Sequence, residues 1–277
     1  MRSSDGALAG TADTSILRMG VRAADHAECP SLASAAGSLL LAVRGAARSR
    51  GPAEVAPGTE ADRLSHAFTV RASAQRHRDD AVLSEEGAKD ARRFRSRPVW
   101  IVDPLDGTQE YAEPVRTDWA VHVALVVDGR LPTGAVALPA RGFTLSTWAT
   151  PASPAASTRR PRIVVSRTRA PEIAVTVAQT LGAELVPLGS AGAKAMAVVC
   201  GEADVYLHAG GQYQCDSAAP VAVAAACGLH VSRLDGSPLR YNQRDPWLPD
   251  LLVCRQELAR RVLEAVAETA AELGRRP

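Results

Sequence analysis

Residues 100–108, Trp-Ile-Val-Asp-Pro-Leu-Asp-Gly-Thr, decide how this chain is interpreted. The first three are an apolar run typical of a buried strand, Pro104 restricts one backbone angle of the turn that follows, and Gly107 allows the backbone to approach a ligand closely. Asp103 and Asp106 are therefore expected to point at one place, where two carboxylates repel each other unless a cation lies between them. Oxygen-only ligation favours magnesium or manganese over zinc. An isolated Asp-x-x-Asp is more often a surface turn, so the rest of the chain decides between these interpretations.

The composition is that of a globular protein with no bulk attraction for polyanions. The 277 residues are 46% hydrophobic, and 32 basic against 30 acidic residues leave a formal charge of +2, which excludes nucleic-acid binding by bulk electrostatics. The five cysteines form no Cys-x-x-Cys pair, which argues against a zinc ribbon or a disulfide framework. Residues 1–20 lack the apolar core of a signal peptide, and no later segment approaches a membrane-spanning run. We therefore expect a cytoplasmic protein whose partner is neither a nucleic acid polymer nor a membrane.

The first half of the chain predicts an α+β arrangement in which acidic residues follow strands. Two helices are expected first, then two short strands, one before Ser84-Glu85-Glu86 and one before the aspartate pair, and finally a hairpin closed by Asp128-Gly129-Arg130. The predicted ranges are 29–47 and 61–76 for the helices and 81–83, 99–102, 119–127 and 131–138 for the strands. A Pro-, Ala-, Ser- and Arg-rich stretch at 151–162 indicates an exposed connection. We predict a metal-binding subdomain over residues 1–150 and a substrate-binding subdomain over 151–277 of one catalytic unit.

The second half alternates between strand and helix patterns, which indicates an α/β layer. The predicted strands are 162–166, 184–187, 204–207 and 251–254, and the predicted helices are 171–181, 192–200, 217–226 and 256–273. Asp216 lies at the entry of the alanine-rich segment 217–226, where the N-terminus of a helix favours a negative charge. A helix-capping role alone would explain an aspartate at this position.

Three separated motifs together resemble those of one enzyme family. They are Ser-Glu-Glu at 84–86, Asp-Pro-Leu-Asp-Gly-Thr at 103–108 and Asp-Ser-Ala-Ala-Pro at 216–220. In this order and spacing they closely resemble the inositol monophosphatase family of magnesium-dependent phosphatases, over about residues 62–249. Further segments, residues 80–86, 118–122, 189–198 and 235–242, are similar to actinobacterial 3'(2'),5'-bisphosphate nucleotidases of the CysQ type. The resemblance implies a layered αβαβα sugar-phosphatase fold and removal of the 3'-phosphate from adenosine 3',5'-bisphosphate.

The resemblance also implies a set of metal ligands. Glu85, Asp103 and the Leu105 carbonyl would hold one magnesium ion, while Asp103, Asp106 and Asp216 would hold a second; two or three ions are expected in total. Metal ions of this kind bind phosphate oxygens, lower the pKa of an attacking water and stabilise the leaving alkoxide. The implied activity is that of a phosphoric monoester hydrolase.

The same resemblance assigns roles around the metals. Thr108 would orient the attacking water with Asp62 as its partner, Glu85 would take part in catalysis, and the amides of Gly107 and Thr108 would face a phosphate oxygen. A small phosphorylated substrate, expected to be a nucleotide, would be contacted by these amides and by the side chains of Ser166, Ser190, Lys194, His208 and Asp216. A solvated helix lysine would explain Lys194 equally well, and a satisfied core histidine would explain His208.

Three further polar residues are expected to lie outside the metal shell. Glu86 and Glu110 are expected at solvated or hydrogen-bonded acidic edges, and His122, inside an alternating strand, is expected to be structural rather than catalytic.

The chain departs from the usual family pattern near the last aspartate. Relatives usually carry Trp directly before it, whereas this chain has Cys215, preceded by Gln212-Tyr213-Gln214. Loss of a large aromatic side chain changes which molecule fits more readily than it changes hydrolysis. Two other substrates therefore stay open: a modified nucleoside monophosphate, such as an aminonucleoside antibiotic intermediate, and an inositol or sugar monophosphate. A non-catalytic nucleotide-binding regulator ranks lower, because all the acidic motif residues are retained. The resemblance also allows a homodimer.

Overall fold

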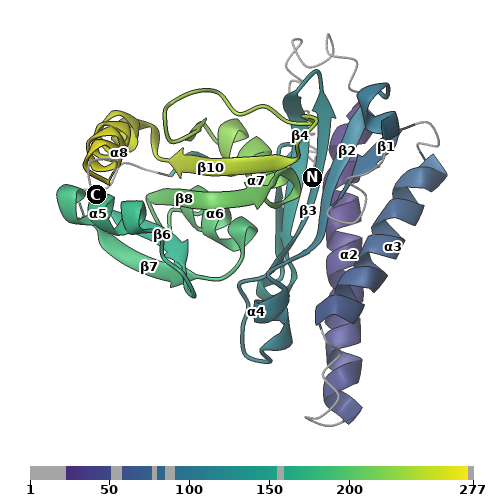
Figure 1. Ribbon diagram of the computed structural model, residues 1–277. Helices are drawn as coiled ribbons and strands as arrows, with labels where there is room; N and C mark the ends of the chain where they lie inside the picture. The colour runs from purple at the N-terminus through teal and green to yellow at the C-terminus, as the bar shows by residue number, and fades with distance from the viewer. Residues whose placement is uncertain (1–22, 51–57, 77–79, 85–90, 155–158, 274–277) are drawn as a thin grey trace, which may run out of the picture.

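The protein consists of alternating layers of helices and sheets (Figure 1). The computed structural model describes residues 23–50, 58–76, 80–84, 91–154 and 159–273. Two five-stranded sheets form its centre. Helices cover the outer face of each sheet, and two helices lie between the sheets (Figure 1).

The first sheet is built from the N-terminal half of the chain. Its order is β1-β2-β3-β4-β5; β1 is parallel to β2 and the other neighbours are antiparallel. The strands are β1 (Ala81–Leu83), β2 (Val99–Asp106), β3 (Ala120–Val127), β4 (Arg130–Leu138) and β5 (Phe143–Ser146). Every residue of β2 and β3 is buried, because helices pack on both faces of these strands.

Alternation along the strands separates the residues that face each helical layer. Trp100 and Val102 of β2 pack with the outer helices α2 (Ala23–Arg50) and α3 (Gly58–Arg76), whereas Ile101 faces the inner helices. The inner helices are α6 (Ala191–Val199) and α7 (Gln214–Ala226). The continuous apolar run that begins the aspartate motif is thus a strand buried on both sides.

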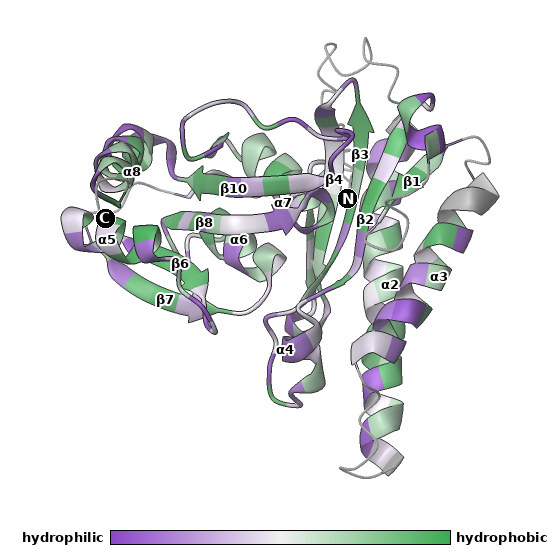
Figure 2. Ribbon diagram, in the orientation of Figure 1, coloured by the Kyte–Doolittle hydropathy of each residue, from purple (hydrophilic) through white to green (hydrophobic). Residues whose placement is uncertain are grey.

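The second sheet is built from the C-terminal half and has the order β7-β6-β8-β10-β9. Strand β6 is parallel to β7 and β8, while β10 is antiparallel to β8 and β9. The strands are β6 (Arg162–Ser166), β7 (Glu184–Leu188), β8 (Val205–Tyr213), β9 (His230–Ser232) and β10 (Trp247–Cys254). Helices α5 (Glu172–Leu181) and α8 (Ala259–Leu273) cover its outer face. Figure 2 shows hydrophobic residues along the strands and mixed faces on the outer helices.

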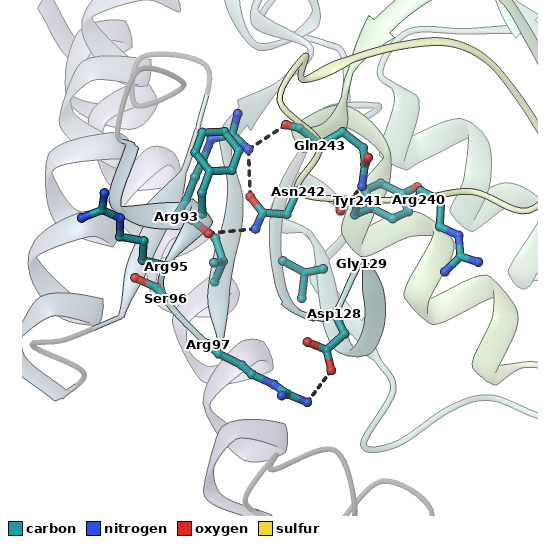
Figure 3. Close-up of a pocket in the computed structure, with 13 residues that line it drawn as sticks. Arg93, Arg95, Ser96, Arg97, Asp128, Gly129, Arg240, Tyr241, Asn242 and Gln243 are labelled. Atoms are coloured by element: carbon teal, nitrogen blue, oxygen red, sulfur yellow. Dashed lines mark hydrogen bonds and ion pairs between the residues drawn. The ribbon is translucent and has the colours of Figure 1, made fainter.

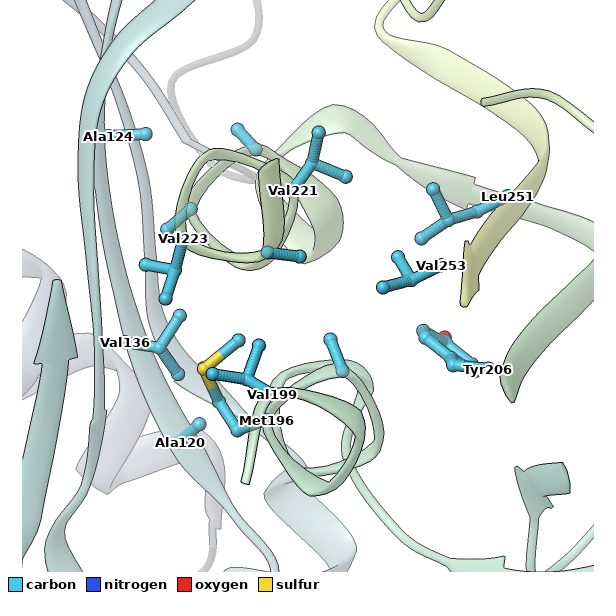
Figure 4. Close-up of a cluster of buried hydrophobic side chains, with 14 of the residues drawn as sticks. Ala120, Ala124, Val136, Met196, Val199, Tyr206, Val221, Val223, Leu251 and Val253 are labelled. Carbon is cyan, nitrogen blue, oxygen red and sulfur yellow. The ribbon is translucent and has the colours of Figure 1, made fainter. Parts of the chain in front are cut away.

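The inner helices join the two sheets through one shared core. Val136 of β4, Met196 of α6, Val223 of α7 and Val253 of β10 belong to the same buried cluster (Figure 4). The order helix, sheet, helix, sheet, helix confirms the predicted αβαβα architecture. It also makes the N-termini of α6 and α7 available to the end of β2.

The predicted elements are present, with longer strands than the sequence indicated. Strands β8 and β10 extend well past their predicted ranges, because pairing with each other compensates for the glycines and polar residues that interrupt the apolar pattern. Strands β5 and β9 were not predicted. Both are short and lie at an edge of their sheet, where hydrogen bonds form on one side only and the pattern is weak.

The sequence analysis expected no segment that approaches a membrane span, but part of helix α2 is long and apolar enough to do so. Residues 24–49 are long and apolar enough to meet that criterion by length and composition, and they are the only such helix in the part of the chain that the structure describes. In the fold, the apolar face of α2 packs against the first sheet through Leu32, Ala33, Ala36 and Leu40.

Candidate metal and phosphate site

A bulge near the end of β2 brings the two aspartates of the opening motif to the same side of the sheet. In a regular strand, residues three apart point to opposite faces. Here Asp103 pairs with His122 and Asp106 with Ala120, so three steps along β2 match two along β3. Pro104 lies within this irregularity, where a residue without an N–H does not interrupt the hydrogen bonding of the sheet. Both carboxylates therefore face the inner helices.

Asp106 is held at the N-terminus of α6. Its Oδ1 accepts a hydrogen bond from the backbone N–H of Ala191 (3.1 Å) and its Oδ2 from that of Gly192 (2.6 Å). Burial alone would raise the pKa of Asp106, but His122, the Gly192 N–H and Lys194 together lower it. The carboxylate of Asp106 is consequently charged and fixed in position.

Asp103 lies in a more repulsive environment. Its Oδ1 accepts a hydrogen bond from the Leu105 N–H (3.1 Å). Burial, followed by the negative charges of Asp106, Asp216 and Asp62, raises the pKa of Asp103 well above its ordinary value. Such a concentration of buried carboxylates is unfavourable without a cation, which is the physical reason to place a metal ion here.

Asp216 approaches Asp103 from helix α7. Ligand atoms of Asp103, Cys215 and Asp216 all lie within 4.8 Å of one another. The alternative that Asp216 caps this helix agrees with the structure in one respect: the N-cap residue is Tyr213, and Asp216, the third residue of the helix, forms a capping box with it. Its Oδ2 accepts a hydrogen bond from the Tyr213 N–H (2.8 Å). The hard carboxylate oxygens fit magnesium, whereas the thiol of Cys215 is not a magnesium ligand.

Glu85 and Glu86 lie outside the described residues. Strand β1 ends at Leu83, which pairs with Ile101, two residues before Asp103. The chain therefore leaves β1 at the same edge of the sheet at which Asp103 lies.

Helix α3 packs against the turn that carries Leu105 and Thr108. The Ser65 hydroxyl donates a hydrogen bond to the Pro104 carbonyl (2.7 Å), and a Cβ added to Gly58 would overlap the Thr108 side chain. Thr108 Oγ1 lies 3.5 Å from the Leu105 carbonyl oxygen. Asp62 belongs to the same helix and contributes to the electrostatic potential at Asp103. The structure thus brings Asp62, Thr108 and the aspartate pair into one region.

His122 is a site residue that the sequence analysis did not select. Its side chain is fully buried, with Nε2 3.1 Å from Asp106 Oδ2, and Nδ1 3.9 Å from Asp103 Oδ2 and 3.2 Å from the Cys215 carbonyl oxygen. His122 therefore contacts two of the segments that form the site, the end of β2 and the start of α7. No signal in the sequence distinguishes it from a core histidine. A Cβ at Gly192 would overlap its Nε2, so this glycine allows α6 to approach.

Ser190 and Lys194 lie at the N-terminal end of α6, where the charge of Lys194 acts on Asp106. The Ser190 hydroxyl caps the helix by accepting a hydrogen bond from the Ala193 N–H (2.9 Å). Lys194 is 5% exposed, donates a hydrogen bond to the Gly189 carbonyl (2.5 Å) and lies over the ring of Tyr206. Its burial lowers the pKa of Lys194 and rules out the alternative of a solvated helix lysine.

Ser166 and His208 are not brought into contact with the aspartates. The Ser166 hydroxyl lies 3.2 Å from that of Thr168, within its own loop. His208 Nε2 lies 2.9 Å from the Gly211 carbonyl oxygen, and burial lowers the pKa of His208. The contact to Gly211 agrees with the alternative of a satisfied histidine.

Glu110 was expected at a solvated or a hydrogen-bonded acidic edge, and the structure shows it hydrogen-bonded. Its Oε1 accepts from Arg167 Nε at 2.6 Å, and Arg167 also pairs with Glu113. Because Arg167 follows β6 and the two glutamates belong to α4 (Thr108–Ala112) and its C-cap, this network ties the aspartate turn to the second sheet.

A separate pocket of about 570 Å³ lies at the opposite end of β2, around Val99 (Figure 3). Arg93 donates hydrogen bonds there to Asn242 Oδ1 and the Gln243 carbonyl (both 2.8 Å), and Arg97 pairs with Asp128. The labelled arginine side chains do not converge on one point (Figure 3). The hydrogen bonds of Arg93 tie residues 242–243 to the segment that precedes β2. The pocket is not part of the acidic site.

Comparison with known proteins identifies the family. The sequence profile of the inositol monophosphatase family matches residues 25–272. The chain belongs to the inositol monophosphatase family. It is accordingly a phosphomonoester hydrolase of a family of magnesium-dependent phosphatases.

Relatives within the inositol monophosphatase family include nucleotide phosphatases. The chain is 49% identical over 241 residues to a 3'-phosphoadenosine 5'-phosphate phosphatase from Mycobacterium tuberculosis, covering 84% of this chain and 90% of that protein. It is 31% identical over 208 residues to the 3'(2'),5'-bisphosphate nucleotidase CysQ of Escherichia coli, covering 71% and 84%. The crystal structure of inositol monophosphatase II from Staphylococcus aureus superposes with a TM-score of 0.69 at 18% identity, covering 84% and 91% of the two chains, which confirms the fold.

Proposed function

We propose that this chain hydrolyses the 3'-phosphate of adenosine 3',5'-bisphosphate. The 49% identity to a 3'-phosphoadenosine 5'-phosphate phosphatase over nearly the whole of both proteins carries this proposal. The cluster of Asp103, Asp106 and Asp216 supports it, because these carboxylates fit the cations that hydrolysis of a phosphate monoester requires.

Two or three magnesium ions would be held by Glu85, Asp103, the Leu105 carbonyl, Asp106 and Asp216. When bound, they would bind phosphate oxygens and activate water. Their positive charge would offset the burial and the carboxylate repulsion that raise the pKa of Asp103. The proximity of Asp106 to two backbone N–H groups keeps its carboxylate oriented toward the same side as that of Asp103.

The remaining residues of the proposed mechanism position the water and the phosphate. The Asp62 carboxylate would accept a hydrogen bond from the Thr108 hydroxyl, which leaves a lone pair on the Thr108 oxygen to accept a hydrogen bond from the attacking water. Glu85 would contribute a further carboxylate. The amides of Gly107 and Thr108 would face a phosphate oxygen. Ser190 and Lys194 would support this region from α6, and Ser166 and His208 would lie toward the organic part of the substrate.

A modified nucleoside monophosphate is a second candidate substrate. Cys215, which is 4% exposed and precedes Asp216, replaces the tryptophan usual in the family. The smaller side chain changes the shape beside the metal ligands without removing one of them.

Phosphate release distinguishes these substrates. Initial rates with magnesium would be compared for adenosine 3',5'-bisphosphate, AMP, 3'-amino-3'-deoxy-AMP and inositol 1-phosphate. Strong preference for the bisphosphate is expected; preference for the aminonucleotide or for inositol 1-phosphate would overturn the proposal. The same preparation, analysed by size exclusion with light scattering, tests the proposed homodimer. We also propose that residues 1–150 form a metal-binding subdomain, that residues 151–277 form a substrate-binding subdomain, and that the protein is cytoplasmic.

A further inference from the structure

Two large aromatic side chains are exposed on one corner of the second sheet. Tyr213, the last residue of β8, is 42% exposed, and Trp247, the first residue of β10, is 45% exposed. The two residues are directly paired across the strands, and their rings lie 5.4 Å apart in an edge-to-face arrangement. We call this pair the aromatic ledge. Tyr and Trp are enriched at binding interfaces, because each offers a large apolar ring together with a polar group.

The aromatic ledge adjoins the acidic site. The backbone N–H of Tyr213 donates its hydrogen bond to Asp216 Oδ2, and Tyr213 occupies the N-cap of the helix that carries Asp216. The ledge and the metal ligand are therefore parts of one short segment. A phosphate bound at the carboxylate cluster would place the remainder of its molecule near these rings.

The ledge is held in place by the surrounding backbone. Trp247 packs on Gly211, where φ is +87° and where a Cβ would overlap the indole ring. The Trp247 N–H donates to Asp245 Oδ1 (3.0 Å), and the Gln214 N–H donates to the Pro246 carbonyl (2.9 Å). These contacts fix the start of β10 against the start of α7. Rings ordered before binding lose little conformational entropy when a ligand stacks on them.

We propose that the aromatic ledge binds the base of the nucleotide, so that Tyr213 and Trp247 select substrates that carry an aromatic heterocycle. This inference rests on the proposed nucleotidase function. Base stacking needs exposed aromatic faces at a fixed distance from the phosphate site, and the ledge provides them beside Asp216. It also provides the aromatic surface that Cys215 does not supply. The side-chain hydrogen bonds of Ser166 and His208, which the sequence analysis placed near the substrate, are made to Thr168 and Gly211, within two or three residues along the chain.

Steady-state kinetics of Trp247→Ala and Tyr213→Ala test the proposal. With adenosine 3',5'-bisphosphate and magnesium, each variant should raise KM at least about tenfold while changing kcat little. Inhibition by inorganic phosphate, which has no base, should be unchanged. Trp247→Phe should restore most of the affinity. Trp148→Ala serves as the matched control, because Trp148 is 56% exposed and lies outside the ledge.

Two results would overturn the role of the ledge, and a third would overturn the proposed function. An unchanged KM in both alanine variants would overturn the proposal. Equal weakening of substrate and of phosphate would also overturn it, because the ledge would then support the metal site instead of binding a base. If wild-type protein releases no phosphate from the bisphosphate, the proposed function fails. Calorimetric titration with AMP and with inorganic phosphate then still tests the ledge, since Trp247→Ala should weaken AMP alone.

Discussion

Replacing either aspartate of the opening motif by asparagine should abolish turnover, but the two variants should differ in stability. Asp106 accepts hydrogen bonds from two backbone N–H groups, on Ala191 and Gly192, one with each oxygen. In Asp106→Asn one oxygen becomes an NH₂ group that faces an N–H donor. The loss of one charge-assisted hydrogen bond costs about 1.5–3 kcal/mol of unfolding free energy, or a decrease in Tm of about 4–10 °C for a chain of this size.

Asp103→Asn should have the opposite effect on the unfolding free energy in metal-free protein. The pKa of Asp103 is raised by burial and by three neighbouring carboxylates, so ionisation of Asp103 destabilises the fold when no cation is present. Because the pKa is higher in the folded than in the unfolded state, wild-type stability in EDTA should fall as the pH rises above the ordinary aspartate pKa. Asp103→Asn should remove this loss and be at least as stable as wild type at neutral pH.

Urea denaturation in EDTA and in magnesium chloride, together with phosphate release, measures both effects. In EDTA the two variants should differ by at least about 1.5–3 kcal/mol in unfolding free energy, with Asp103→Asn the more stable. Magnesium should stabilise wild type and not Asp103→Asn. The reasoning is refuted if Asp103→Asn is the less stable variant in EDTA, or if Asp106→Asn keeps wild-type stability.

Three further predictions concern packing, pH and metal. Gly192→Ala should lower both the unfolding free energy and kcat, because the new Cβ would displace His122. Gly45 lies on an exposed part of a helix with no atom within 4 Å of a new Cβ, so Gly45→Ala should raise the unfolding free energy by about 0.5–1 kcal/mol. Thermal melts and rates of phosphate release compare the two variants. Burial alone would raise the pKa of Asp118, but hydrogen bonds from an arginine and a backbone N–H lower it. Its stabilisation is therefore present above the ordinary aspartate pKa and is lost as the pH falls through the lowered value, so Asp118→Asn should flatten the acid side of the stability profile measured by urea titration. Magnesium at about 100 times its Kd should stabilise wild type by about 2.7 kcal/mol; Asp216→Asn should require a higher magnesium concentration for the same Tm shift, and an unchanged titration would remove Asp216 from the ligand set.

The sequence predicted the acidic chemistry because it resides in short, local motifs. The run at 100–108 contains its own strand, turn and carboxylates, and the two other motifs have the family's order and spacing. Regular elements with strong periodicity were also predictable from local patterns. The layered architecture followed from the resemblance and from the alternation of strand and helix patterns.

Contacts between distant segments were not predictable in this way. The sequence did not indicate that β2 carries a bulge, that His122 contacts two aspartates, or that Lys194 is buried. Each depends on which strand or helix lies opposite, and nothing in the local pattern records that neighbour.

Local residue order alone therefore determined which side chains carry charge and which segments form strands and helices, because these properties depend on side-chain chemistry and backbone preference within a few residues. The tertiary structure alone decided that carboxylates from β2 and α7 converge, that backbone N–H groups of α6 hold one of them, and that Tyr213 and Trp247 meet beside them. The reason is physical: electrostatic repulsion, hydrogen bonding and ring contact act over a few ångströms in space, between residues that are far apart in the chain.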